Sequence, residues 1–210
     1  TLNNSDVAES IYYAVENGAD IINMSFGSYA QSNLVIDALQ SAFSQAVLIA
    51  AAGNDNLPTE CLPFPSASFP GAYIYVLGIM AEDENGAKAG FSNFDCKEYT
   101  LLEYELIAPG TKIYSTLPNE NYAAWNGTSM AAPVASGVAA LVRTLYPDKS
   151  VYSSRFIMGQ LAATGTKNRY FSLNAFAALS STPQPRLTSI DYKIFDDPSL
   201  SEVNDGDGII

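Results

Sequence analysis

The chain of 210 residues contains no histidine, and this absence removes the commonest base of serine and cysteine hydrolases from the chain itself. It also excludes zinc sites that need an imidazole ligand. Only two cysteines are present, Cys61 and Cys96, and they do not have the spacing of metal ligands. Whether they form one disulfide or remain two unrelated thiols is left open, because the answer depends on export. The sequence therefore predicts no metal site built on histidine or cysteine.

Basic residues are scarce as well, with 10 lysines and arginines against 22 acidic residues and a net charge of -12. A chain without a basic stripe is a poor partner for nucleic acid, since it cannot displace the counterions of the phosphate backbone. No apolar run reaches the roughly 20 residues of a membrane span, and we expect none. The polar start at Thr1 is not that of a signal peptide, so we expect a mature form or a fragment.

Helical and extended patterns alternate in the first quarter of the chain, and the hydrophobic fraction of 48% is that of a globular protein. Residues 5–17 have helical spacing with Ser5 as the expected N-cap, and residues 33–45 repeat this period. The short apolar runs 19–27 and 46–54 read as buried strands. Such a strand, helix and strand form a βαβ unit, so "SFG" (25–27) and "AGN" (52–54) are expected at one edge of a parallel sheet.

The remainder of the chain continues this pattern up to about residue 180. A helix over 134–146 has Arg143 as its only charge, which indicates a central, buried position. Further strands are expected at 72–80, 104–110 and 112–116, and short helices at 151–162 and 174–179. We expect an α/β fold with a mostly parallel sheet.

The composition changes after residue 180. We expect a principal domain over 1–180, an extended linker over 181–186 and the beginning of a probable β-sandwich module over 187–210. The acidic stretch "NDGDG" (204–208) is a fragment of a calcium loop without its later ligands, and a solvated acidic turn is the alternative interpretation.

The stretch "NGTSMAAP" (126–133) places a serine directly before the apolar helix. Gly127 permits a tight turn, Ser129 falls at the start of the helix, and Pro133 is expected near the first turn. A serine hydroxyl becomes a nucleophile when a base takes its proton and preorganised donors hold the oxyanion. A simple N-cap is the alternative role for this serine.

Several segments in one order resemble the subtilisin-like serine peptidases, the subtilase family. "NGTSMAAPVASGVAAL" is similar to the nucleophile motif of that family, and "ADIINMSFG" to its substrate-binding strand. "LIAAAGNDN" resembles the strand that ends in the oxyanion-hole asparagine; "GFSNFD" and "IAPGTKIYST" also match. The resemblance runs from about residue 5 to about residue 180 and implies a three-layer subtilisin-like fold and a serine endopeptidase acting on proteins or peptides.

The resemblance also implies roles for individual residues. Ser129 would be the nucleophile, and the side-chain amide of Asn54 would form the oxyanion hole with the Ser129 N–H. An extended substrate would be bound by Ser25, Phe26, Gly27, Gly53 and Thr128. An ordinary turn residue at Asn54 and strand-terminating glycines at positions 27 and 53 are the plain alternatives. The resemblance implies no required cofactor, leaves a structural calcium ion open and favours a secreted, cell-surface or periplasmic protein.

The chain departs from the family pattern at its start. Subtilases carry their catalytic aspartate and histidine before the "SFG" segment, where this chain has 24 residues and no histidine. Asp6 and Asp20 are outside the aspartate motif and are explained by a helix first turn and a helix-to-strand turn. We therefore expect the domain to be incomplete, with its N-terminal part as partner and the triad completed upstream of residue 1. The chain alone is expected to be inactive.

Two other interpretations compete with this one. A pseudo-enzyme could keep the scaffold as a peptide- or protein-binding module, although such a module needs neither Ser129 nor Asn54. A serine-carboxyl peptidase would use a glutamate in place of histidine, with Glu9 and Glu16 as the upstream candidates. Asn54 argues against that family, because an acidic residue stands there in its members.

Overall fold

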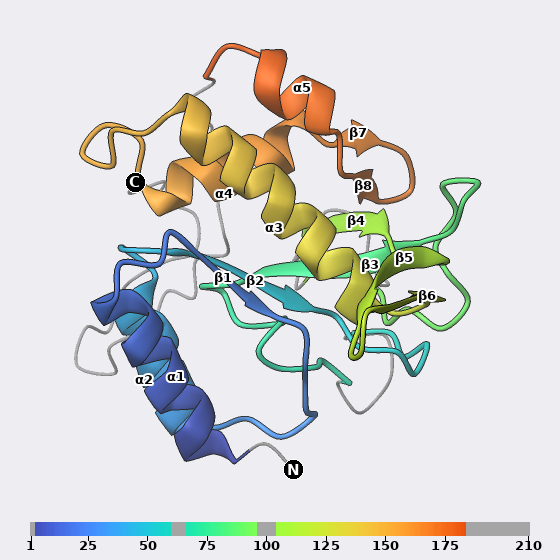
Figure 1. Ribbon diagram of the computed structural model, residues 1–210, viewed down its shortest axis with the longest axis horizontal. Helices are drawn as coiled ribbons and strands as arrows, with labels where there is room; N and C mark the ends of the chain where they lie inside the picture. The colour runs from blue at the N-terminus through green and yellow to red at the C-terminus, as the bar shows by residue number, and fades with distance from the viewer. Residues whose placement is uncertain (1–2, 60–65, 96–103, 184–210) are drawn as a thin grey trace, which may run out of the picture.

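A sheet whose strands are mostly parallel forms the middle of the molecule, as the computed structural model of the chain shows for residues 3–59, 66–95 and 104–183 (Figure 1). Within these residues the sheet has the order β1-β2-β3-β4-β8-β7, and the pairs from β1 to β8 are parallel. The strands are β1 (Ile21–Met24), β2 (Val47–Ala51), β3 (Leu77–Glu82), β4 (Leu106–Pro109), β7 (Thr166–Lys167) and β8 (Phe171–Ser172). A separate antiparallel hairpin is formed by β5 (Ile113–Leu117) and β6 (Asn121–Trp125).

Helices cover both faces of this sheet (Figure 1). One face carries α1 (Asn4–Glu16) and α2 (Asn33–Ala42), and the other carries α3 (Thr128–Leu145), α4 (Ser154–Thr164) and α5 (Ala175–Ser180). All residues of β2 and β3 are buried, as expected for parallel strands with helices on both sides. The predicted three-layer α/β fold is confirmed.

Helix α3 lies closest to the sheet, which it contacts at β1, β2, β3 and β4. Its buried side includes four alanines, Ala131, Ala132, Ala135 and Ala139, whose small side chains allow a close approach to the strands. Within the described residues α3 is also the one helix long and apolar enough to cross a membrane, but 50% of it is buried in the fold. Its apolar composition follows from that central position.

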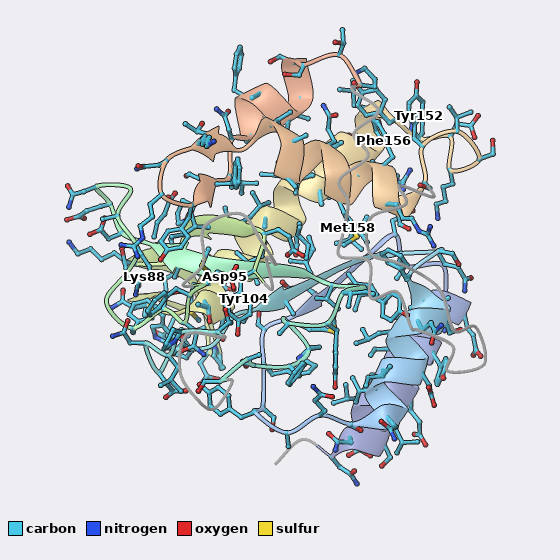
Figure 2. All side chains as sticks on the ribbon, turned by 180° about the vertical axis from the view of Figure 1, so that it is seen from behind. Lys88, Asp95, Tyr104, Tyr152, Phe156 and Met158 are labelled. Atoms are coloured by element: carbon cyan, nitrogen blue, oxygen red, sulfur yellow. The ribbon has the colours of Figure 1, made fainter. Side chains whose placement is uncertain are left out.

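Aromatic rings join the end of α3 to the start of α4. The ring centroids of Tyr152 and Phe156, labelled in Figure 2, are 4.9 Å apart, and Tyr146 contacts both rings. The buried Arg143 donates through Nη1 to the carbonyl oxygens of Tyr146 and Tyr152, at 3.1 and 2.6 Å. The only charge of α3 is thus used to close the α3–α4 connection.

The structure corrects several expected boundaries. The N-cap of α1 is Asn3, whose side chain accepts from Ser5 N at 3.1 Å, and not Ser5. Strand β3 begins five residues later than residue 72, and α3 begins at Thr128, so Pro133 lies inside the helix. Strands β6, β7 and β8 were not predicted. Cys61, Cys96, the module over 187–210 and the second half of the linker, 184–186, lie outside the described residues.

Glu82, at the end of β3, carries a carboxylate that the fold has buried. It is 7% exposed, and Ser172 Oγ on β8 lies 2.8 and 3.0 Å from its two carboxylate oxygens. Burial raises the pKa of Glu82 above its ordinary value, the Ser172 hydrogen bond opposes this rise, and the charge of Asp83 adds to it. Because folding raises this pKa, the protonated carboxyl group favours folding and the ionised carboxylate opposes it. The stabilisation from the protonated form is complete below the ordinary pKa of a glutamate and is lost as the pH rises through the raised pKa.

We therefore expect Glu82→Gln to be more stable than the unmodified protein at neutral pH, with the difference closing on acidification to about pH 4. Thermal denaturation between about pH 4 and pH 8 measures this. Glu84→Gln is the matched control, because Glu84 is exposed and its ion pair with Lys112 is worth at most about 1 kcal/mol. Lower stability of Glu82→Gln at neutral pH would show that the contacts of the carboxylate outweigh its burial.

Candidate active site

The start of α3 meets the carboxyl end of β1 through a pair of hydrogen bonds between two serines. Ser129 Oγ donates to the carbonyl oxygen of Ser25 at 3.0 Å, and Ser25 Oγ donates to the carbonyl oxygen of Ser129 at 2.9 Å. In a regular helix that second carbonyl would accept from the N–H of residue 133. Since Pro133 has no N–H, the carbonyl is free for Ser25. The proline thus lets β1 hold the first turn of α3.

Asn54, just beyond the end of β2, is oriented by Thr128. Its side-chain oxygen accepts from Thr128 N at 2.8 Å and from Thr128 Oγ1 at 3.0 Å, which identifies that atom as the amide oxygen. The Thr128 hydroxyl also accepts from Gly53 N at 3.1 Å, and Thr128 is fully buried. The Asn54 nitrogen, Nδ2, therefore points away from Thr128 and can donate elsewhere.

Two N–H donors lie near Gly127, in the turn before Ser129. A Cβ added at this glycine would lie 3.3 Å from Met130 Sδ, 3.6 Å from Ser129 N and 3.7 Å from Asn54 Nδ2. Among the described residues neither nitrogen has a hydrogen-bond acceptor, and the Ser129 N–H belongs to the unpaired first turn of α3. Two donors without an acceptor at the start of the helix that carries Ser129 suit the stabilisation of an oxyanion.

Of the residues predicted to bind substrate, Ser25, Gly53 and Thr128 meet at the start of α3. Ser25 is bonded to Ser129, and Gly53 is bonded to Thr128, whose hydroxyl is occupied by contacts within the chain. Phe26 is half-buried against the core, and Gly27 follows it. The segments that follow β1 and β2 therefore lie at one edge of the parallel sheet, as the βαβ pattern predicted.

A buried residue that the motifs did not single out holds the loop after β2. Asn93 is 0% exposed, and its Oδ1 accepts from Asp55 N and Leu57 N, each at 3.0 Å. Its Nδ2 donates to the Ala52 carbonyl at 3.0 Å and to Tyr29 Oη at 3.1 Å. Tyr29 Oη also donates to the carboxylate of Asp55. The sequence signal that could have pointed to Asn93 was its position inside "GFSNFD", one of the segments that resemble the subtilase family.

No carboxylate among the described residues contacts Ser129, whose hydroxyl bonds only the Ser25 carbonyl. Asp20 forms ion pairs with Lys149 and Arg143 at the amino end of β1. Asp6, Glu9 and Glu16 are exposed on α1, which covers the face of the sheet opposite α3. None of the four is placed to act as a base for Ser129.

Metal ligands do not gather in the described parts of the chain, where no group of three or more Asp, Glu, His or Cys residues could hold an ion. The acidic stretch 204–208 lies outside those parts.

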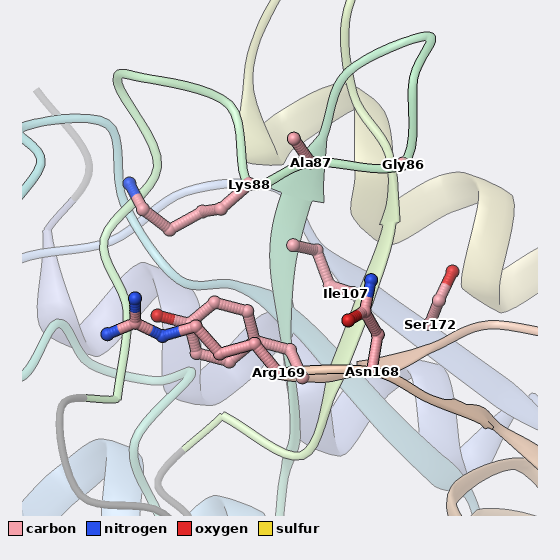
Figure 3. A pocket seen from close by; sticks show the side chains of 8 residues that line it. Gly86, Ala87, Lys88, Ile107, Asn168, Arg169 and Ser172 are labelled. Carbon is pink, nitrogen blue, oxygen red and sulfur yellow. The ribbon is translucent and has the colours of Figure 1, made fainter.

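A separate surface pocket of about 280 Å³ lies between the loop after β3 and the β7–β8 hairpin (Figure 3). Lys88 lines it and donates to Asn56 Oδ1 and to two backbone carbonyls. Burial lowers the pKa of Lys88, and the positive charge of Arg169 lowers it further. The other lining residues are Gly86, Ala87, Ile107, Asn168, Arg169, Tyr170 and Ser172. The pocket includes neither Ser129 nor Asn54.

Comparisons with known proteins match this arrangement. Residues 1–176 match the sequence profile of the subtilase family. The chain is 35% identical over 163 residues to subtilisin DY of Bacillus licheniformis, covering 77% of this chain and 55% of that protein. It is 35% identical over 178 residues to M-protease of Shouchella clausii (strain KSM-K16), covering 83% of this chain and 43% of that protein. The chain thus spans about half the length of these curated relatives.

Among solved structures, the prenylagaramide maturation protease PagA has a TM-score of 0.73 and 29% sequence identity, and the match covers 85% of this chain and 68% of that protein.

Proposed function

The chain belongs to the subtilase family of serine peptidases, and from this membership we propose that it supplies the nucleophile and the oxyanion-stabilising donors of a serine endopeptidase. Its substrates would be proteins or peptides, bound in extended form between the segments that follow β1 and β2. The observation that carries the proposal is that Ser129 N and Asn54 Nδ2, two donors with no acceptor among the described residues, both lie near Gly127 at the start of α3.

In the proposed reaction a base takes the proton of Ser129 Oγ, and the oxygen attacks the peptide carbonyl carbon. The carbonyl oxygen becomes negative and lies between Asn54 Nδ2 and Ser129 N. The base then returns the proton to the leaving amine, and water releases the acyl group from Ser129 by the reverse sequence. Thr128 keeps the Asn54 amide in place throughout by holding its oxygen.

The base of this scheme has to come from another segment, because the chain has no histidine. We propose that the histidine and its aspartate lie upstream of residue 1, in the N-terminal part of the same catalytic domain. That segment would have to place an imidazole within hydrogen-bonding reach of Ser129 Oγ. The chain alone would then be inactive.

An uncovered surface supports this partner. Five exposed apolar or small residues line one side of α3 at helical spacing: Pro133, Gly137, Ala140, Leu141 and Leu145. Leu141 is 52% and Leu145 is 50% exposed, although α3 is the central helix of its layer. Next to this stripe, β1 is an edge strand of a parallel sheet, a class of sheet that is normally covered. A further strand beside β1 would end near Ser25 and Ser129.

Labelling with a fluorophosphonate tests the proposal, because this reagent phosphonylates an activated serine, whose oxygen attacks phosphorus and displaces fluoride. We expect no labelling and no peptide hydrolysis by the chain alone, and both when the chain is produced together with the upstream segment. Labelling of the isolated chain at Ser129 would reveal a base within it. If the protein with the upstream segment stays unlabelled but binds peptides, the binding-module interpretation replaces this one.

We also propose export, as the family resemblance implies, and no required cofactor. A structural calcium ion remains a proposal, to be tested by the effect of a chelator on thermal stability.

A further inference from the structure

A second pocket, of about 260 Å³, opens where the end of α3, the start of α4 and the turn before β2 meet. Its lining residues are Ser44, Gln45, Arg143, Lys149, Ser153 and Ser154. Arg143 lies 14 positions beyond Ser129 on α3, which corresponds to about 21 Å along the helix at about 1.5 Å per residue. The pocket is therefore separate from the candidate active site.

Arg143 is a buried cation in this pocket, 7% exposed, and its hydrogen-bonding capacity is only partly used. Its Nη1 donates to the carbonyl oxygens of Tyr146 and Tyr152. Its Nε is buried and has no hydrogen-bond acceptor among the described residues. Since a buried N–H without an acceptor costs free energy, an acceptor that enters the pocket would remove that cost.

The start of α4 and Lys149 add to the positive charge of the pocket. Ser153 is the N-cap of α4 and Ser154 its first residue, and the N–H groups of Ser154 and Arg155 have no acceptor among the described residues. These groups carry the positive end of the helix dipole. Lys149 lines the pocket with its side chain 51% exposed. Two cations and a helix N-terminus thus face one pocket, in a chain with a net charge of -12.

Asp20 is the counter-charge of these cations, but it does not satisfy both. Its Oδ1 lies 2.6 Å from Lys149 Nζ, whereas its distance to Arg143 Nε is 3.8 Å, beyond the range of a hydrogen bond. The side chain of Asp20 is 42% exposed, so water weakens its attraction for the cations. In the described part of the chain no second carboxylate pairs with Arg143 or Lys149. The pocket keeps an excess of donors and positive charge.

We propose that this pocket binds a small oxyanion of the phosphate class. The donors come from different elements: the guanidinium group of Arg143, the ammonium group of Lys149 and the N–H groups at the start of α4. Phosphate has acceptor oxygens in several directions, and it is bound by such groups through charge-assisted hydrogen bonds. A bound phosphate would join the end of α3 to the start of α4. This site is independent of the proposed peptidase function.

Calorimetric titration with inorganic phosphate at constant ionic strength tests the proposal, with the chain produced together with the upstream segment. We expect saturable binding at one site, and Lys149→Gln to weaken it by about 10-fold through loss of one charge-assisted hydrogen bond. Lys149 is chosen because Arg143 also holds the α3–α4 connection. Lys112→Gln is the matched control, since it removes the same charge from an exposed side chain paired with Glu84, and should leave the affinity unchanged.

Asp20→Asn separates this proposal from the alternative that Arg143 and Lys149 serve only to pair with Asp20. If the pocket binds phosphate, loss of the competing carboxylate should tighten that binding by about 5-fold, the effect of one exposed ion pair. Under the alternative, Asp20→Asn lowers thermal stability and no phosphate binds. Phosphate affinity that is unchanged in both Lys149→Gln and Asp20→Asn also overturns the proposal, as does an equal response to sodium chloride.

Titration with glycerol phosphate identifies the source of the bound group. Affinity equal to that of inorganic phosphate supports a pocket that accepts a phosphate group carried by a larger molecule. Binding of inorganic phosphate alone supports a site for the free ion.

Discussion

Ser129→Ala is expected to abolish peptide hydrolysis and fluorophosphonate labelling of the chain combined with its upstream segment. The replacement removes the oxygen that would form the acyl bond and keeps the first turn of α3, whose carbonyl contact with Ser25 comes from the backbone. In subtilisin, a member of this family, loss of the nucleophile lowers kcat by about 2 × 10⁶, and we expect a loss of that order. Peptide hydrolysis assays and labelling followed by mass spectrometry measure it.

Ser180→Ala is the control for this replacement. Ser180 ends α5, and its exposed hydroxyl donates only to the Phe176 carbonyl. It should keep full activity. Labelling that persists in Ser129→Ala would place the reactive group elsewhere in the chain and contradict the role given to Ser129.

Asn54→Ala is expected to lower kcat by about 10² to 10³ with little change in KM, the range known for the corresponding donor of subtilisin. The reason is that Asn54 Nδ2 would bond the carbonyl oxygen chiefly after it becomes negative, so its loss affects the transition state more than the bound substrate. The Ser129 N–H would remain as the second donor. Steady-state kinetics on a peptide substrate separate kcat from KM.

Asn56→Gly provides the matched control, because Asn56 lies in the same loop but its side chain accepts from Lys88, and glycine tolerates its φ of 53°. A tenfold rise in KM for Asn54→Ala with unchanged kcat would assign Asn54 to substrate binding instead. The N–H and hydroxyl of the buried Thr128 would lose their common acceptor and lower stability as well, which thermal denaturation of Asn54→Ala detects separately.

Local patterns in the sequence were sufficient for the parts of the site that depend on neighbouring residues. The apolar runs before "SFG" and "AGN" predicted two adjacent strands, and β1 and β2 pair in parallel as expected. The family resemblance led from "NGTSMAAP" to Ser129 and Asn54, and the structure brings the segments of both residues together. The apolar pattern predicted that this helix begins at residue 134, directly after Pro133, whereas α3 begins at Thr128 and includes the proline.

Contacts between distant residues could not be predicted in the same way. Asn93 holds the loop after β2 through partners 36 to 41 positions away, and no periodicity marks such pairs. The hairpin strand β6 was missed because it has little apolar alternation; both Tyr122 and Trp125 are exposed. The exposed stripe of α3 could not be predicted from the sequence either. A helix that is apolar nearly all round is predicted to be buried on every side, so its pattern does not show which side is exposed.

The proline inside α3 has a consequence for how a complete site would be assembled. By freeing the Ser129 carbonyl for Ser25, Pro133 fixes the serine within this chain alone, and Thr128 fixes the Asn54 amide in the same way. The backbone that carries half of the proposed catalytic machinery is therefore held in place by contacts within this chain. Under the proposed function, gain of activity would be a docking event in which the Ser129 hydroxyl exchanges its present acceptor, the Ser25 carbonyl, for the incoming base.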